Sequence, residues 1–141
     1  MAVRNRYDAF AAAESIGYNY VISHGRRENL GTVYEANKDG RQQSLKISAH
    51  TKKVSSPRYL VQLWVSALTK VDRFILWFED EPWFHDVPAA RLAAIFEDYP
   101  FVRTVRHKRW QVNLDIETGS FEIGGGNSWD FLAYREPNPS S

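Results

Sequence analysis

A lysine and a glutamate on two adjoining strand-like segments are the residues of this sequence best placed to do chemistry. Between them stands Asp39-Gly40, a dipeptide typical of the two-residue turn of a β-hairpin. With that turn, Glu35 lies opposite Ser44 and diagonally across from Lys46 on the same face. A carboxylate there can bind Mg²⁺ through its oxygens, and a neighbouring ammonium can orient an attacking water and stabilise charge on a phosphate.

The same register sorts the hairpin into a polar face and an apolar face, because cross-strand partners share a face and neighbours along a strand alternate. The polar face carries Glu35, Asn37, Gln42, Ser44, Lys46 and Ser48, and the apolar face carries Thr32, Tyr34, Ala36, Leu45 and Ile47. The polar face has two interpretations. It is either a catalytic arrangement or a half-solvated ion pair that contributes about 0.2 to 1 kcal/mol.

A second carboxylate lies on the first expected helix, over residues 3–16, which Gly17 ends. Helical spacing predicts one inward stripe, made of Val3, Tyr7, Phe10, Ala11 and Glu14. A carboxylate that faces a sheet requires a partner or a metal ion. Glu14 is therefore either a metal ligand or a helix-end carboxylate that reaches water.

The remaining segments predict an α+β fold, in which a mixed sheet with an αβββαβ core is flanked by helices and followed by a C-terminal antiparallel β extension. Ser56-Pro57 favours a helix start, so the second helix is expected over residues 57–70. Strands are expected at 17–24, 32–37, 41–48, 73–78, 101–108, 110–117, 120–125 and 129–134, with a turn at Thr118-Gly119 and a third helix at 88–99. One domain is expected over residues 1–135, followed by a flexible tail over 136–141.

The order and spacing of these elements over residues 3–78 resemble the restriction-endonuclease-like, or PD-(D/E)xK, nuclease superfamily. That family has a helix, three strands, a helix and a strand, with an acid on the second strand and an acid-x-lysine triplet on the third. By this resemblance Glu35 is the metal-binding acid, Lys46 is the motif lysine and Glu14 is the extra acid that some members carry. The motif is degenerate, because Ser44 stands two residues before the lysine, where the family has Asp or Glu.

The resemblance implies a small DNA endonuclease or DNA-processing protein that hydrolyses phosphodiester bonds with water activated by Mg²⁺ or Mn²⁺. Glu35 and Glu14 would bind the metal, and the catalytic group would comprise Lys46, Glu35, Gln42, Gln43 and Ser44. Duplex DNA would be held by Arg26, Arg27, Lys52, Lys53 and Arg58, and the protein could act as a homodimer. A catalytically inactive DNA-binding member of the same fold is an alternative.

Charge and composition limit the other classes of function. Residues 1–70 carry eleven Lys and Arg against five Asp and Glu, whereas residues 71–141 carry seven against twelve, and the basic half is suited to a polyanion. The chain has no cysteine, and its four histidines show no zinc-ligand spacing, so disulfides and a zinc site are not expected. Without a leader-like start or a long apolar run, we expect a cytoplasmic protein that has no contact with the membrane.

The acidic segment from Glu79 to Asp86 indicates a different class of function. Within it, Trp83 and Phe84 adjoin several carboxylates, and exposed aromatic residues of this kind mark protein contacts. The alternative to a nuclease is therefore a non-enzymatic protein-binding module, of an inhibitor or immunity type, that contacts its partner through this segment.

Overall fold

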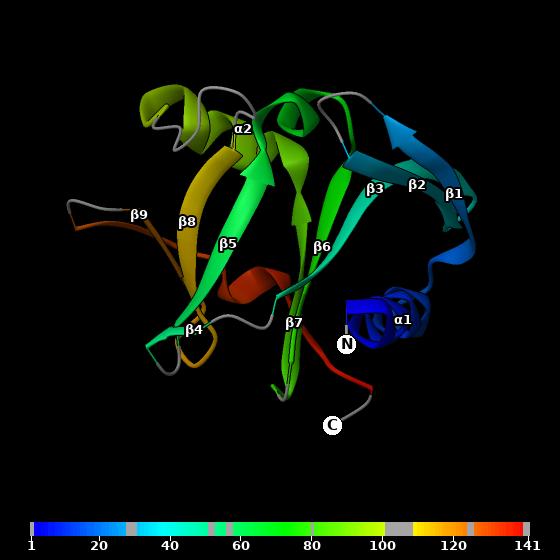
Figure 1. Cartoon of the computed structure of the whole chain (residues 1–141), viewed down its shortest axis with the longest axis horizontal. Helices are drawn as coiled ribbons and strands as arrows, with labels where there is room; N and C mark the ends of the chain where they lie inside the picture. Colours follow the sequence, from blue (N-terminus) through cyan, green and yellow to red (C-terminus); the bar gives the residue numbers. More distant parts are fainter. Residues whose placement is uncertain are drawn as a thin grey trace.

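The computed structural model describes residues 2–27, 31–50, 53–55, 58–79, 81–100, 109–123 and 126–139, which form an α+β fold of helices and two sheets (Figure 1). The helices are α1 (Ala2–Ser15), η1 (Val65–Thr69), α2 (Ala89–Asp98) and η2 (Leu132–Tyr134), of which η1 and η2 are short 3₁₀-helices. The strands are β1 (Asn19–Arg27), β2 (Gly31–Lys38), β3 (Arg41–His50), β4 (Lys53–Ser55), β5 (Arg58–Trp64), β6 (Arg73–Phe78), β7 (Trp83–Pro88), β8 (Arg109–Asp115), β9 (Ser120–Ile123), β10 (Asn127–Asp130) and β11 (Arg135–Pro137). The predicted α+β class is confirmed.

The larger sheet is mixed, and its strands lie in the order β1-β2-β3-β6-β7-β11. In it β3 and β6 are parallel neighbours, and the other neighbouring pairs are antiparallel. The smaller sheet has the order β10-β9-β8-β5-β4 and is antiparallel. The strand at 73–78 therefore joins the first sheet, and the last third of the chain supplies the antiparallel extension, both as predicted.

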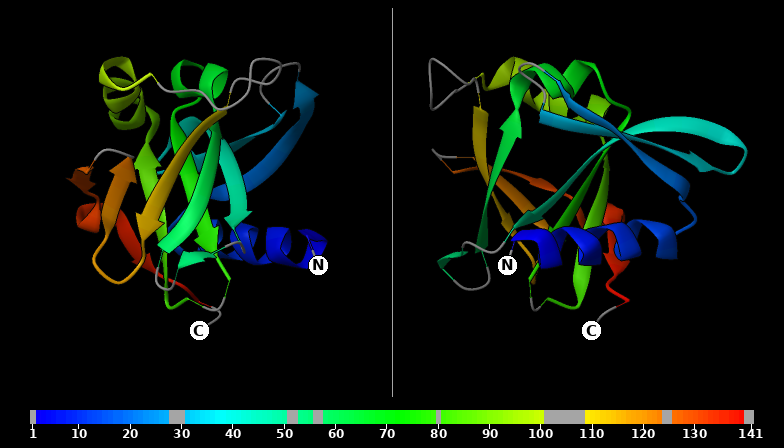
Figure 2. Two further views of the ribbon diagram at one scale, coloured as in Figure 1. Left: turned by 60° about the vertical axis from the view of Figure 1, so that its left-hand side comes forward. Right: turned by 45° about the vertical axis from the view of Figure 1, so that its right-hand side comes forward.

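The hairpin of β2 and β3 has the predicted turn and register. Asp39 and Gly40 have φ values of 53° and 76°, as a turn with two left-handed central residues requires. Glu35 pairs with Ser44, and the register runs from Tyr34 to Lys38 without a shift. The end of this hairpin, coloured cyan, projects beyond the rest of the molecule in the right-hand view of Figure 2.

Helix α1 covers one face of the larger sheet, where it packs on β3 and β6 (Figure 2). Over residues 9–15, where the burial of its side chains is described, the buried residues are small ones, Ala9, Ala12 and Ala13, which let the helix lie close to the strands. The predicted inward stripe is wrong, because Ala11 and Glu14 are exposed. The stripe of small residues lies on a neighbouring face of the same helix.

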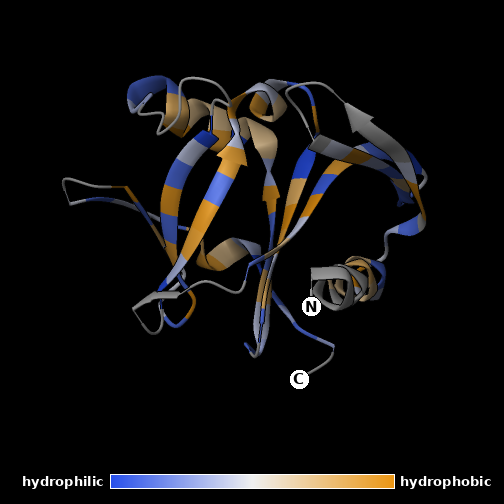
Figure 3. Ribbon diagram, in the orientation of Figure 1, coloured by the Kyte–Doolittle hydropathy of each residue, from blue (hydrophilic) through white to orange (hydrophobic). Residues whose placement is uncertain are grey.

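The helix expected over residues 57–70 is wrong. Its described part forms β5 and then η1, and β5 pairs along its whole length with β8. Tyr59, Val61 and Leu63 are buried, whereas Arg58 and Gln62 between and beside them are exposed, which is the two-residue period of a strand. Figure 3 shows apolar and polar residues alternating along β8, the partner of β5.

The acidic segment from Glu79 to Asp86 is interior at its end and partly exposed before it, since Glu79, Glu81 and Trp83 are half-buried and Pro82 is exposed, so its role as a contact surface stays a prediction. Its second half belongs to β7, between β6 and β11, where Phe84, His85 and Asp86 are buried. At the start of the expected tail, Glu136 and Pro137 belong to β11, and the backbone N–H of Asn138 donates to the Pro82 carbonyl at 2.8 Å.

The two faces of the larger sheet support two hydrophobic clusters. One lies under α1 and includes Tyr18, Leu45 and Trp77. The other lies between the two sheets and includes Phe74, Trp110 and, from the predicted helix α2, Leu92. The strand expected at 129–134 is replaced by β10 and η2, and the strand expected at 101–108 falls outside the described residues. Among the described residues, no helix has the length and apolar character that crossing a bilayer would require.

Candidate functional site

The polar face of the β2–β3 hairpin is assembled as the sequence predicts. Leu45 and Ile47 are buried beneath α1, so Ser44 and Lys46, which alternate with them on β3, lie on the opposite face. Glu35 on β2 is the direct cross-strand partner of Ser44 and shares that face. These three side chains are partly exposed, and so they are accessible to a ligand.

A carboxylate that the sequence did not identify meets Ser44. Asp72 precedes β6, and its Oδ2 accepts hydrogen bonds from the Ser44 backbone N–H at 2.8 Å and from the Ser44 hydroxyl at 3.2 Å. The backbone N–H of Asp72 donates to the Ser44 carbonyl at 2.9 Å. Ser44 is thus directly bonded to an acid that lies just before β6, the neighbouring parallel strand.

Glu35 and Lys46 are each held by further hydrogen bonds on this face. The Gln42 side-chain amide donates to Glu35 Oε2, and Lys46 Nζ donates to the Thr32 carbonyl at 2.9 Å. The site that we call the hairpin site therefore consists of Glu35, Gln42, Ser44, Lys46 and Asp72. Its donors for a cation are hard oxygens, two carboxylates supported by a hydroxyl and an amide, which is the chemistry that Mg²⁺ prefers.

Two predicted site residues do not reach the hairpin site. Gln43 alternates with Gln42 and Ser44, and with no bulge in the pairing it lies on the opposite face of β3. Glu14 is exposed on α1, where it lines a hollow of about 830 Å³ together with Phe10 and Tyr34. Tyr34 belongs to the apolar face of the hairpin, so Glu14 and Glu35 lie on opposite sides of the sheet.

The predicted DNA-binding residues fall into three groups. Arg26 and Arg27 end β1, opposite Thr32 and Gly31 of β2, at an edge of the larger sheet. Lys53 begins β4, and Lys52 lies outside the described residues. Arg58 lies on the smaller sheet, where its Nε donates to Glu122 Oε1 at 2.8 Å.

A buried ionic cluster connects the β2–β3 hairpin to β7 of the same sheet. Asp86 is only 5% exposed, and it accepts hydrogen bonds from Arg73 Nε at 2.6 Å and from the Tyr18 hydroxyl at 3.1 Å, with Lys38 Nζ 3.8 Å away. Burial and then the negative charge of Asp86 raise the pKa of Tyr18 well above its usual value, so its hydroxyl stays protonated as a donor. This cluster holds Lys38, beside the turn of the hairpin, and no pattern in the sequence pointed to it.

Comparison of the chain with protein-family models, with curated proteins and with solved structures gives no significant match. The assignment of function therefore depends on the hairpin site and the fold.

Proposed function

We propose that this protein is a small metal-dependent DNA endonuclease or DNA-processing protein whose active centre is the hairpin site. The observation that carries the proposal is the pair of hydrogen bonds from Ser44 to the carboxylate of Asp72. The resembled family places an acid at the Ser44 position, and here Ser44 binds the carboxylate of Asp72, which lies just before β6. Glu35 lies directly across from the same serine, so two carboxylates flank it.

The donor set fits a magnesium ion. Mg²⁺ is usually held by one or two carboxylates, with waters and substrate phosphate oxygens completing its shell. Over the described parts of the chain, no group of three or more acidic, histidine or cysteine side chains gathers at one point, so Glu35 and Asp72 would hold the ion together with substrate. When bound, Mg²⁺ supplies an activated water and neutralises charge on the phosphate.

Side chains of the protein would supply the remaining catalytic, positioning and DNA-binding roles. Lys46 would orient the attacking water and stabilise the charge that develops on the phosphate, because its ammonium is held on this face by the Thr32 carbonyl. Ser44 would position Asp72, and Gln42 would position Glu35. Arg26 and Arg27, at the end of β1 beside β2, would contact the phosphates of duplex DNA.

The test is nicking of supercoiled plasmid in the presence of Mg²⁺ or Mn²⁺. We expect Lys46→Ala, Glu35→Ala and Asp72→Asn each to lower the rate by at least about a hundredfold, because removing one charge-stabilising group from a catalytic centre typically has that effect. The matched control is Glu14→Gln, which removes a carboxylate from the other side of the sheet and should leave the rate unchanged. Equal nicking by all five proteins, the wild type included, would contradict the proposal.

Binding of DNA without cleavage would identify the inactive member of the same fold. In that outcome the plasmid stays intact, while Arg26→Ala and Arg27→Ala still weaken DNA binding. Absence of both cleavage and DNA affinity would leave the non-enzymatic class of function.

A further inference from the structure

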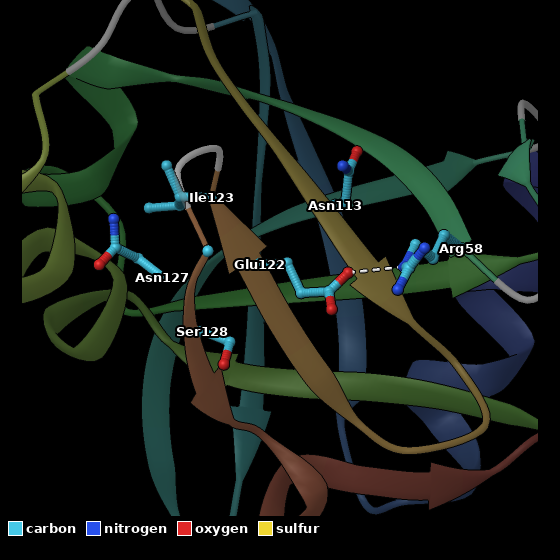
Figure 4. A pocket seen from close by; sticks show the side chains of 7 residues that line it. Arg58, Asn113, Glu122, Ile123, Asn127 and Ser128 are labelled. Atoms are coloured by element: carbon cyan, nitrogen blue, oxygen red, sulfur yellow. Dashed lines mark hydrogen bonds and ion pairs between the residues drawn. The ribbon is translucent and has the colours of Figure 1, made fainter.

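A second polar site lies on the outer face of the smaller sheet, away from the cluster between the sheets. Its hollow has a volume of about 300 Å³ and is lined by Arg58, Asn113, Glu122, Ile123, Asn127 and Ser128 (Figure 4). That volume lies at the lower end of the range for small-molecule sites. None of these residues belongs to the hairpin site, and Arg58, which the sequence assigned to DNA, is here paired with Glu122.

Three of the lining residues form a row across three hydrogen-bonded strands. Glu122 on β9 pairs with Asn113 on β8 and with Ser128 on β10. Leu114 and Phe121, the neighbours of this row along the strands, are fully buried in the cluster between the sheets. The row is therefore fixed by the sheet, so its polar groups are positioned before any ligand binds.

The polar groups of the hollow combine donors with acceptors and carry no net charge. Arg58 and Glu122 form an ion pair at 2.8 Å, with Asn113 and Ser128 on either side of Glu122 (Figure 4). An amide and a hydroxyl each donate and accept, whereas the guanidinium only donates and the carboxylate only accepts. A bound anion would meet the Glu122 carboxylate and a bound cation would meet the Arg58 guanidinium, so a neutral ligand suits the hollow best.

We propose that this hollow binds a neutral sugar. Neighbouring hydroxyl groups of a sugar ring both donate and accept, as the row of Asn113, Glu122 and Ser128 requires. The charged pair of Arg58 and Glu122 would make the stronger hydrogen bonds to them.

The test is a titration of the isotope-labelled full chain, followed by proton–nitrogen correlation spectra. Glucose, galactose, mannose and N-acetylglucosamine are added separately, each to tens of millimolar, with adenosine and inorganic phosphate as parallel probes. We expect at least one sugar to give saturable shifts centred on Asn113, Glu122 and Ser128. Shifts at these residues with adenosine or phosphate alone, or no shifts with any probe, would overturn the proposal.

A variant pair separates the hollow from the rest of the sheet face. Glu122→Gln keeps the size of the side chain but removes its charge, and we expect about a tenfold loss of sugar affinity, because a charge-assisted hydrogen bond is lost. The control is Gln111→Ala, on the same face of β8 but outside the hollow, where Gln111 accepts from Gln62 at 3.3 Å. Equal affinity of Glu122→Gln and the control for the sugar would also overturn the proposal.

Discussion

Single residues in this chain take their chemistry from neighbours that are distant in sequence. Ser44 becomes part of a candidate active centre because Asp72, 28 residues later, bonds to it. His85 shows the opposite effect, since it is fully buried and neither ring nitrogen has a hydrogen-bond partner among the described residues. Burial, with a smaller contribution from the charge of Arg135, lowers the pKa of His85 to about 4, so its imidazole is neutral in the folded protein at pH 7.

His85 should make the protein less stable in acid. The unfolded chain has the higher pKa, 6.5, so it binds the proton first, and the stability due to neutral His85 is complete above pH 6.5 and is lost as pH falls towards 4. The loss amounts to at most about 3 kcal/mol. Urea unfolding of the wild type and of His85→Leu, each at neutral and acidic pH, measures it, and we expect a smaller loss in the variant. The same loss in both proteins would show that His85 does not titrate in this way.

At the level of elements, the sequence predicts structure well where one local signal dominates. Asp39-Gly40 determines the turn and register of the β2–β3 hairpin, and with them the shared face of Glu35, Ser44 and Lys46. The segment of β5 carries two conflicting signals, because Leu60, Trp64 and Leu68 repeat at helical spacing while Tyr59, Val61 and Leu63 alternate. Pairing with β8, which no local pattern reveals, decides for the strand.

The candidate site was predictable only as far as the hairpin extends. Gln43 and Glu14 were assigned from chain position and helical spacing, but strand alternation and the packing of small alanines on α1 place them elsewhere. Asp72 depends on the parallel pairing of β3 with β6, in which Leu45 lies opposite Arg73. A strand expected to join the sheet, with an acid just before it, was the one signal that pointed to Asp72.

Two glycine turns with almost equal backbone angles test how closely an element is packed. Gly40 and Gly119 have φ values of 76° and 74°, but a Cβ on Gly40 would meet nothing within 4 Å, whereas one on Gly119 would lie 3.0 Å from Leu132 Cα. We expect Gly40→Ala to cost about 1 kcal/mol from backbone strain alone. Gly119→Ala should cost at least about 2 kcal/mol, because the backbone of η2 must also shift. Urea unfolding of both variants measures the loss in the free energy of unfolding. Equal losses would show that the backbone of η2 shifts without an energetic cost.

Over the whole molecule, basic and acidic residues are separated along the sequence, and the fold partly keeps them apart in space. The basic first half of the chain forms β1, β2 and β3, so the hairpin site lies at the basic end of the larger sheet. The acidic second half supplies the smaller sheet with Asp115, Glu122 and Asp130. A polyanion is therefore expected to approach from β1 and β2, whereas the hollow around Glu122 faces a region that does not favour anions.

The salt dependence of DNA affinity tests this division. Each phosphate contact releases a counterion, so the logarithm of the binding constant should fall linearly as the logarithm of the salt concentration rises, by about 0.9 for each contact. Arg26→Ala and Arg27→Ala should each reduce the slope by about one, since each removes one contact at the end of β1. Arg91→Ala removes an equal charge from α2, which packs on η1, β6 and β7 and not on β1, and should leave the slope unchanged. Fluorescence anisotropy with a labelled duplex at several salt concentrations measures the slope for all four proteins. If the three substitutions alter the slope equally, net charge controls DNA affinity, and β1 is not a phosphate-binding edge.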